Sequence, residues 1–588
     1  MEFSQDVQNV LAIVLFLLRI LTPALSIAVL AGCFLSLKRG RRREEPVVLL
    51  EDVGSGISIP VLYWENSIGR SRSCDIVLPD HTVSRDHAVL MRRESGWMIT
   101  DTNSKAGTLL NGKKIKGDTR VLPGDVLSIG SSALMLKRVS DGTPLPPKKP
   151  PKKGKLQIKR APSPGKLMIG LSVIQTFLSA QCCLAQGKFS WEPLLAFGVL
   201  LLLSWGLYLF STKALHRVSF EVETVGLLLG SVGTMLLTGI NLTPNYTQLA
   251  SFFLGIVLFC FLIWFMGDLD RVMKWRIPIA VAALVLFAVN LVIGSSVHGS
   301  KNWIILGPVS IQPSELIKIA FIFTGASTLN KLQTTRNLTV FLVFTALCMG
   351  ALFLMKDLGT ACVFFITFLV IAFMRSGSIR TIILVLVAAG LGAFLLVQFM
   401  PHITNRFEAW RHVWDFADTT GYQQTRVLMY AASGGLFGVG LGQGYMHQIF
   451  AGDSDLVFGM LCEEMGLLMA LVVILAIAFL ILFARSDVTR SRSTFYSISA
   501  CAAAGLLLFQ SCLNVFGSTD ILPLTGVTLP FISAGGTSMM AAWGLLAFIK
   551  ASDERTYAVR RLPAAKQTQP IAPRPAKRAQ PKGRRGKA

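Results

Sequence analysis

The sequence has few charged residues: Asp, Glu, Lys and Arg make up 15% of its 588 positions, whereas soluble domains carry about 25%. Acidic residues are the scarcer kind, 33 against 57 basic ones, so the formal net charge is +24. Apolar residues make up 52% of the chain, and the mean hydropathy is +0.56. This balance excludes a set of soluble domains alone and predicts a polytopic α-helical membrane protein.

Residues that usually form disulfides or zinc sites are also sparse and scattered. The ten cysteines lie mostly inside apolar runs and contain no C-x-x-C pair, and the seven histidines form no H-E-x-x-H pattern. Neither a disulfide framework nor a zinc site is indicated.

The excess of positive charge is concentrated beside apolar runs and in two low-complexity tracts. Residues 140–166 are predicted to form an extended Pro/Lys linker, and residues 551–588 a disordered basic tail. Basic residues next to spans are typical of cytoplasmic loops and suit anionic membrane lipids. We therefore expect membrane lipids and no nucleic acid among the partners, with a merely solvated tail as the alternative for 551–588.

Residues 1–45 contain the first predicted span. The apolar run 10–37 is interrupted only by Arg19 and Pro23, and a Lys/Arg cluster follows it at once. The run is long enough to cross a bilayer, and it is too long and too acidic at its start for a cleaved signal peptide. The pattern predicts a signal-anchor with its N-terminus outside, so the segment that follows is expected in the cytoplasm.

Further apolar runs of spanning length follow residue 166. They lie at 167–185, 194–210, 222–240, 249–266, 277–293, 316–329, 338–355, 358–374, 379–400, 456–483, 494–516 and 529–549. With the anchor they predict about thirteen spans, of which 316–329 is short. If the spans alternate, each loop expected in the cytoplasm carries Lys or Arg, which supports the count. The loops expected outside contain 301–315, Asp357, 401–455 and 517–530.

Residues 46–139 have a different pattern, with short alternating apolar runs separated by Gly, Asp, Asn and Pro. This spacing predicts an all-β sandwich. The segment contains Gly69-Arg70, then Ser84-x-x-His87, then Asn111-Gly112. With these motifs in this order, it resembles a forkhead-associated (FHA) domain.

The FHA resemblance implies that loops of the sandwich bind a phosphothreonine protein made by a serine/threonine kinase. It places Arg70, Ser84, Arg85 and Lys105 at the phosphate, where an Arg fork and a hydroxyl make strong charge-assisted bonds. His87 is expected to brace the loop. The family usually has Thr-Asn where this chain has Lys105-Ala106, so the alternative is a sandwich that has lost its ligand.

Asp357 is the central candidate in the membrane part, because it stands between two long apolar runs. An ionised Asp within a span costs at least about 2.5 kcal/mol, so such residues usually line an aqueous cavity or an interface. The alternative is a polar loop in which the charge is simply solvated.

Asp357 is one of several motifs that lie in stretches expected on the outer face. They are Lys301-x-Trp303 with Gly307-Pro308, Gln312-Pro313-Ser314-Glu315, Asp357-Leu358-Gly359-Thr360, Gly434-Gly435-Leu436-Phe437-Gly438, Glu463-Glu464-x-Gly466, and Pro523-x-Thr525-Gly526 with Leu529-Pro530-Phe531-Ile532-Ser533. In this order the stretch 222–549 resembles the SEDS (RodA/FtsW-like) family of cell-wall proteins.

The SEDS resemblance implies a ten-span core over 222–550, with the anchor and a two-span hairpin at 167–221 as additions. It implies a peptidoglycan glycosyltransferase that polymerises lipid II outside the plasma membrane and releases undecaprenyl diphosphate, in elongation, division or sporulation. Asp357 matches the essential Asp, and a class B penicillin-binding protein is the implied partner. Residues implied at the diphosphate or sugar are Lys301, Trp303, Glu315, Lys318 and Lys356.

The chain departs from the SEDS pattern at several positions. Lys356 stands where the family usually has Pro, and Asn302 where it usually has a second Arg. Ala451 and Asp453 replace the usual Glu and His ahead of Asp455. These last substitutions reduce the weight of any role assigned to that loop.

The residue chemistry fits glycosyl transfer from a lipid diphosphate. The leaving group is already ionised, so one carboxylate base with nearby lysines suffices, whereas a hydrolase usually needs paired carboxylates. A divalent cation, Mg²⁺ or Mn²⁺, could bridge the diphosphate to carboxylates. Glu315 and Lys318 share a helix face and could instead form a structural ion pair. The alternatives in function are a lipid II flippase and a non-catalytic cell-wall scaffold.

Overall fold

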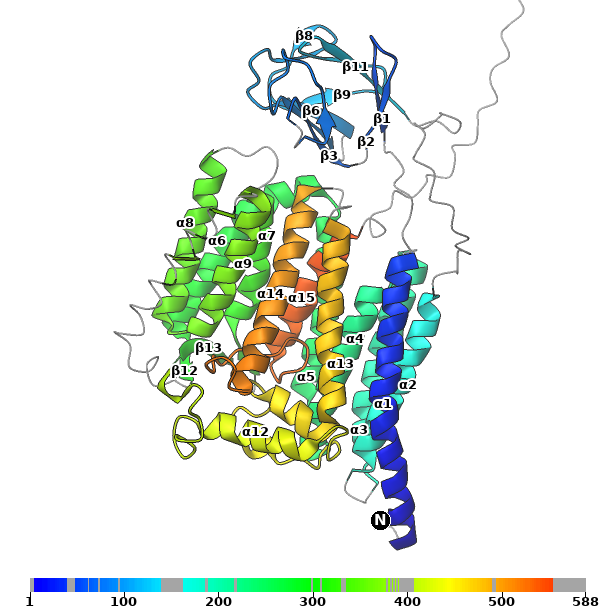
Figure 1. Cartoon of the computed structure of the whole chain (residues 1–588), viewed down its shortest axis with the longest axis vertical. Coiled ribbons are helices and arrows are strands. Elements are labelled where there is room, and N and C mark those ends of the chain that lie inside the picture. Colours follow the sequence, from blue (N-terminus) through cyan, green and yellow to red (C-terminus); the bar gives the residue numbers. More distant parts are fainter. Residues whose placement is uncertain are drawn as a thin grey trace, which may run out of the picture.

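The computed structural model describes residues 5–39, 48–61, 63–71, 74–93, 96–138, 162–185, 189–215, 219–297, 300–306, 309–328, 335–376, 379–380, 383, 386–387, 390, 407–488 and 493–553. They form a long helical domain and a β-sandwich next to one of its ends (Figure 1). Most of the predicted linker 140–166, most of the predicted span 379–400 and the tail from 554 lie outside the described residues.

The β-sandwich predicted for 46–139 is present and consists of two facing sheets. One has the strand order β2-β1-β11-β10-β7-β8 and the other β4-β3-β5-β6-β9. The strands are β1 (Val48–Asp52), β2 (Ser58–Val61), β3 (Glu65–Gly69), β4 (Ile76–Val77), β5 (Ala88–Arg93), β6 (Gly96–Asp101), β7 (Thr108–Leu110), β8 (Lys113–Lys114), β9 (Thr119–Val121), β10 (Val126–Ile129) and β11 (Ser132–Lys137). Alternate apolar residues such as Leu50, Ile99 and Leu127 are fully buried between the sheets, which is why the period-2 pattern was visible in the sequence.

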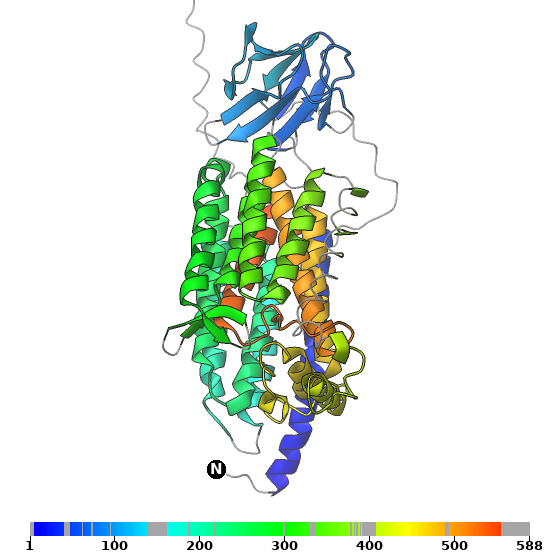
Figure 2. The same cartoon turned by 90° about the vertical axis from the view of Figure 1, so that its left-hand side faces the viewer.

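The helical domain contains the expected apolar helices. They are α1 (Gln5–Arg39), α2 (Pro164–Cys183), α3 (Pro193–Leu209), α4 (Glu221–Asn241), α5 (Tyr246–Met266), α6 (Leu269–Ile293), α7 (Pro313–Thr328), α8 (Thr335–Leu354), α9 (Leu358–Ser376), α13 (Val457–Val488), α14 (Thr494–Ser518) and α15 (Gly536–Ser552). Eight of the described helices are long and apolar enough to span a membrane: α1 to α6, α13 and α14. The apolar parts of α8 (Thr339–Leu354) and α9 (Leu358–Met374) are shorter, and α7 and α15 have 16 and 17 residues. The short helices run beside the long ones (Figures 1 and 2).

Three stretches differ from the sequence prediction. The last span was predicted from 529, but α15 begins at Gly536, because Pro530 and the Gly535-Gly536 pair favour a loop. The stretch 301–315, predicted as a loop, contributes most of a small sheet made of β12 (Ser295–Val297), β13 (Ser300–Leu306) and β14 (Val309–Ile311). The loop 401–455 also contains a helix, α12 (Tyr422–Gly434).

Buried polar contacts join the helices at several depths. The Lys550 ammonium on α15 lies 3.0 Å from Glu223 Oε2 on α4, and neither side chain is exposed. Gln175 on α2 donates to the hydroxyls of Ser204 on α3 and Ser231 on α4, at 2.9 Å each. The additional helices are thus packed into the bundle, since a buried amide is stable only where it has partners.

The β-sandwich touches the helical domain through the start of β3 and the end of β5. Glu65 Oε2 accepts a hydrogen bond of 3.3 Å from the amide of Thr494, the first residue of α14. Arg93 lies 3.5 Å from Asp270 near the start of α6. A carboxylate at a helix N-terminus is favourable because it meets the positive end of the helix dipole.

Candidate functional site

Candidate site residues occur at both ends of the molecule. One set lies on loops of the β-sandwich. The other lies at the end of the helical domain away from the sandwich, which we call the distal end, where β12, β13 and α12 are found (Figures 1 and 2).

Asp357 immediately precedes α9 at the distal end. Its Oδ1 accepts a hydrogen bond of 3.1 Å from the amide of Thr360, which is the usual bond of an N-cap residue. Lys356 before it has a left-handed φ of 57°, and this turn directs the Asp357 side chain back over the helix start. Asp357 is only 8% exposed, so the alternative of a freely solvated loop charge does not describe it.

The second oxygen of Asp357 is bound by a residue that the sequence prediction did not assign to the site. Asn302 Nδ2 donates to Asp357 Oδ2 at 2.8 Å, and Asn302 is 7% exposed. The other amide atom, Asn302 Oδ1, is buried without a hydrogen-bond partner. Asn302 had been noted only as a departure from the family pattern, and that departure was the available signal.

The lysines predicted near Asp357 do not all point to it. The backbone amide of Lys301 on β13 donates to the Met355 carbonyl at 3.0 Å, in the turn before Asp357. Its ammonium donates to the Leu291 carbonyl at 2.7 Å, in the last turn of α6, where a cation is favoured by the helix dipole. Lys356 is exposed and Trp303 is half-buried.

The loop between α14 and α15 packs against the start of α9, next to Asp357. A Cβ added at Gly359 would lie 2.6 Å from the Thr525 carbonyl oxygen, so this loop packs directly on the start of α9. A Cβ added at Gly526 would lie 3.3 Å from Asp455 Oδ2. The Thr525 hydroxyl is buried without a partner. Tertiary packing therefore brings Asp455 towards Asp357, although about a hundred residues separate them in the chain.

The segment 453–455, just before α13, is hydrogen-bonded to the end of α14 and to the loop between α14 and α15. Asn514 Nδ2 on α14 donates to the Asp455 carbonyl at 2.7 Å and to the Val527 carbonyl at 2.8 Å. The Ser533 hydroxyl donates to the Ser454 carbonyl at 2.6 Å. The sequence prediction gave the Asp455 loop little weight; in the structure this loop packs beside the Thr525 loop at the distal end.

Glu315 and Lys318 form an ion pair, one of the two arrangements considered from the sequence; the other was contact with the diphosphate or sugar. Lys318 Nζ lies 2.6 Å from Glu315 Oε1 and 3.1 Å from Gln510 Oε1, and both charged side chains are almost fully buried. Gln510 in turn donates to the Thr528 carbonyl at 3.0 Å. The pair thus joins α7 to α14 and to the loop that carries Thr525.

The Glu463-Glu464 motif holds the backbone of the glycine-rich segment 434–446, which we call the glycine loop. The two oxygens of Glu463 accept from the amides of Tyr445 and Met446, each at 2.8 Å. Glu464 Oε2 accepts from the Gly442 amide at 2.9 Å. Both carboxylates are 1% exposed, so their role here is to fix the backbone of this glycine-rich loop.

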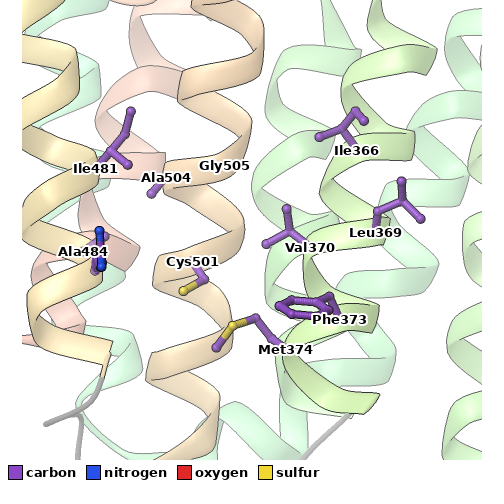
Figure 3. Close-up of a pocket in the computed structure, with 11 residues that line it drawn as sticks. Ile366, Leu369, Val370, Phe373, Met374, Ile481, Ala484, Cys501, Ala504 and Gly505 are labelled. Carbon is purple, nitrogen blue, oxygen red and sulfur yellow. The ribbon is translucent and has the colours of Figure 1, made fainter. Parts of the chain in front are cut away.

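An apolar cavity of about 530 Å³ lies between α9 and the pair α13 and α14. Figure 3 shows Ile366, Leu369 and Val370 facing residues of the other two helices across it. Arg485 and Cys501, near the sandwich end of α13 and α14, also line it. The cavity therefore lies away from Asp357, and its walls offer no set of polar groups for a sugar.

The loops of the β-sandwich bring the predicted phosphothreonine residues together. The Arg70 amide donates to the Ser84 carbonyl at 2.9 Å, and the Lys105 amide donates to Ser84 Oγ at 3.0 Å. Because Ser84 Oγ accepts that bond, its own proton remains able to donate to a phosphate. Arg70, Arg85 and Lys105 are exposed.

His87 lies beneath these loops. It is fully buried, its Nδ1 accepts from the Ser84 amide at 3.1 Å, and its Nε2 lies 3.2 Å from the Gly107 carbonyl. The side chain therefore braces two loops and does not face a ligand, as the sequence prediction expected.

Acidic residues beside the sandwich loops are held in the charged form. Hydrogen bonds from the Ser131 and Thr82 hydroxyls keep the pKa of the half-buried Asp80 carboxyl well below its usual value. For Asp101, partial burial opposes the shift, but bonds from Ser104 and Thr108 outweigh it and lower the pKa. Each carboxylate ties a ligand loop to its neighbour.

No group of three or more His, Cys, Asp or Glu side chains within the described ranges is arranged to hold a metal ion. The divalent cation considered from the sequence therefore has no ready-made protein cage among those residues.

Comparisons with known proteins agree on two regions. The sequence profile of the FtsW/RodA/SpoVE cell cycle proteins matches residues 222–556, more than half of the chain, and the FHA domain profile matches 66–130. A protein of Buchnera aphidicola named "Probable peptidoglycan glycosyltransferase FtsW" is 28% identical over 56% of this chain and 88% of its own length. The "Peptidoglycan glycosyltransferase RodA" of Mycobacterium tuberculosis is 27% identical over 50% of this chain and 67% of its own. A chain from the solved structure "Structural coordination of polymerization and crosslinking by a peptidoglycan synthase complex" is 24% identical, covers 58% of this chain and 98% of its own, and has a TM-score of 0.49.

Proposed function

Because the chain belongs to the FtsW/RodA/SpoVE family, with relatives named peptidoglycan glycosyltransferases, we propose that it polymerises lipid II into glycan strands outside the plasma membrane. The observation that carries the proposal is the Asp357 carboxylate, buried at the distal end between the Asn302 amide and the start of α9. The process served is elongation, division or sporulation.

In the proposed reaction Asp357 is the general base. The attacking sugar hydroxyl gives its proton to the carboxylate while its oxygen bonds to the anomeric carbon of the donor sugar. The bond from that carbon to the diphosphate oxygen breaks, and the electron pair leaves with undecaprenyl diphosphate. The leaving group is already ionised, so no general acid is required. The two hydrogen bonds to Asp357 support this role by orienting the carboxylate.

The surrounding residues divide into two proposed groups. Lys301 and Trp303 lie on β13, and Lys356 lies on the turn before Asp357; all three are proposed to contact the diphosphate or the sugar of lipid II. Glu315 and Lys318 are proposed to support the Thr525 loop through Gln510. The pair is poorly placed to meet a substrate, because both side chains are almost fully buried and each charge is already paired with the other.

Asp455 is a second candidate for the base. Its carboxylate lies against Gly526, and Asp455 is only partly buried, whereas Asp357 is 8% exposed. The greater exposure of Asp455 favours this role. In that alternative, Asp357 fixes the geometry of the site and Asp455 takes the proton.

Polymerisation by the purified full-length protein tests both the glycosyltransferase activity and the choice between Asp357 and Asp455 as the base. Wild type is expected to make glycan chains from lipid II. Asp357→Asn should lose at least about 100-fold in rate, since the amide keeps the shape but cannot take a proton, with unchanged folding and insertion. If Asp455→Asn is inactive and Asp357→Asn stays within a few-fold of wild type, the base is Asp455. No chains from wild type would overturn the glycosyltransferase proposal.

The two alternative functions have less support. A lipid II flippase needs charges that can serve a pathway through the bilayer, and the buried Lys318 and Lys550 are each paired with a glutamate. A non-catalytic scaffold would have no need for an oriented, buried Asp357. The polymerisation assay also separates these, because a flippase or a scaffold would form no glycan.

The protein is a multi-pass plasma membrane protein, and its orientation is part of the proposal. The basic residues that precede α2, follow α1 and lie between the spans at the sandwich end favour a cytoplasmic sandwich and tail. The N-terminus and the Asp357 site are then outside, where lipid II presents its sugars.

Two protein partners follow from the proposal. A class B penicillin-binding protein would cross-link the new strands and is expected at the distal end, near 401–455. A phosphothreonine protein made by a serine/threonine kinase would bind Arg70, Ser84, Arg85 and Lys105 of the FHA domain, which recruits the polymerase to its place of work.

A further inference from the structure

The N-terminal helix α1 is more closely fitted to the bundle than a membrane anchor requires. A stripe of small polar residues runs along one side of it, and Thr22, Ser26 and Ser36 are buried. Gln181 on α2 donates to the Thr22 hydroxyl at 3.0 Å, and the Ser36 hydroxyl donates to Glu221 Oε1 on α4 at 2.6 Å. An anchor that only faced lipid would have no use for such a stripe.

Arg19 continues this stripe towards the distal end. Its Nη1 donates to the Gly438 carbonyl at 3.2 Å, and its Nε is buried with no partner. A Cβ added at Gly440 would lie 2.2 Å from Nη2, so the guanidinium rests on the glycine loop itself. One helical turn earlier, Phe16 packs edge-on against Phe437, with ring centroids 5.9 Å apart.

The glycine loop depends on its neighbours for its shape. Gly435, Gly438, Gly440 and Gly442 all have left-handed φ values between 55° and 116°, a conformation that only glycine adopts without strain. The Val439 and Gly440 amides donate to backbone carbonyls of α13 at 2.9 Å, and Glu463 and Glu464 take further amides. The Gly438 carbonyl is satisfied from the other side, by Arg19.

We propose that Arg19 is a positioning residue, and that α1 clamps the glycine loop against α13. The guanidinium is a fitting clamp, because it offers several donors in one plane to a backbone that presents carbonyls. An intramembrane arginine is expected to have such a specific partner. The chain continues from this loop to Asp453–Asp455, which is hydrogen-bonded to the Thr525 loop. The consequence for catalysis rests on the proposed function, whereas the clamp itself does not.

The clamp is tested by hydrogen exchange of the full-length protein in lipid nanodiscs. Arg19→Leu should raise the exchange of the 438–446 amides by about 10-fold or more, the effect of losing one charged hydrogen bond. Leucine is favoured over arginine within a bilayer, so insertion is not at risk. Arg19→Lys keeps a donor and should restore part of the protection.

Ser26→Ala is the matched control, since the Ser26 hydroxyl is buried in the same helix and donates only to the Thr22 carbonyl of α1. It should leave the loop amides unchanged. Unchanged exchange in Arg19→Leu, or equal changes in Arg19→Leu and Ser26→Ala, would overturn the clamp.

Polymerisation by the same variants tests the link to catalysis. We expect kcat to fall in Arg19→Leu and to recover partly in Arg19→Lys, with the amount of folded protein unchanged. If wild type polymerises and Arg19→Leu loses loop protection at full kcat, the positioning role is wrong. If wild type forms no glycan, the proposed function fails, but the exchange result still decides the clamp.

Discussion

Lys318 and Glu315 form a charged pair whose proposed role is to support the distal-end site from within the bundle. Their ion pair is buried between α7 and α14 and is linked through Gln510 to the loop beside Asp357. Breaking a buried pair costs more than replacing it, because the remaining charge is left without a partner.

Lys318→Ala should therefore destabilise the protein by about 3–5 kcal/mol, the usual cost of a buried charge left alone. The double variant Lys318→Met with Glu315→Gln removes both charges at similar volume and should regain most of the stability. Thermal unfolding in detergent measures the stability of both variants, and polymerisation measures their activity. A double variant as stable as wild type but inactive would assign the pair a direct role on the substrate.

At the scale of elements, the ligand loops of the β-sandwich are held by carboxylates. Asp80 accepts from the Ser131 and Thr82 hydroxyls and so joins the loop before β5 to the turn between β10 and β11. These bonds keep the pKa of Asp80 below the 3.8 of an unperturbed Asp. A lowered pKa in the folded state means that the stabilisation is present above about pH 4 and is lost as the pH falls further.

Asp80→Asn should accordingly lower the unfolding temperature of the sandwich at pH 7. The difference from wild type should shrink at pH 3, since wild type then begins to lose the same bonds. Calorimetry of the full chain, following the transition of the sandwich, makes the comparison. A difference that is equal at both pH values would mean that the charge of Asp80 is unimportant to the loops.

At the scale of the whole molecule, the sandwich separates its contact with the helices from its ligand loops. Glu65 at the start of β3 meets α14, and Arg70 follows the other end of the same strand. A strand of this length puts roughly 15 Å between them. A phosphopeptide bound at the proposed loops would therefore leave the contact with the helical domain in place.

Arg70→Ala combined with Ser84→Ala should weaken binding of phosphothreonine peptides by about 100-fold or more, because two charge-assisted hydrogen bonds are lost. The protein should be misplaced in cells, while the purified enzyme polymerises at nearly the wild-type rate. Lys116→Ala, an exposed charge outside these loops, serves as control. If wild type binds no peptide of a phosphothreonine library, the Lys105-Ala106 departure has cost the domain its ligand.

Hydropathy and short motifs were sufficient for the architecture. A bilayer permits only helices whose backbone bonds are internal, so apolar runs predicted the spans closely; α9, for example, begins at Leu358 as expected. The period-2 pattern of 46–139 predicted the sandwich, and the Gly-Arg and Ser-x-x-His motifs predicted its FHA-like character, which the FHA profile over 66–130 supports. These signals are local, and each can be recognised within a few residues of sequence.

Only the tertiary structure decided which residues share the distal end. The Lys301 ammonium caps α6, while Asn302 binds Asp357; one position along a strand reverses the face on which a side chain lies. Arg19 looked like an interruption in an anchor and meets Gly438, 419 positions away. Hydropathy determines that a helix lies in the membrane, but side-chain packing against its neighbours determines which way the helix turns and which residues it brings together.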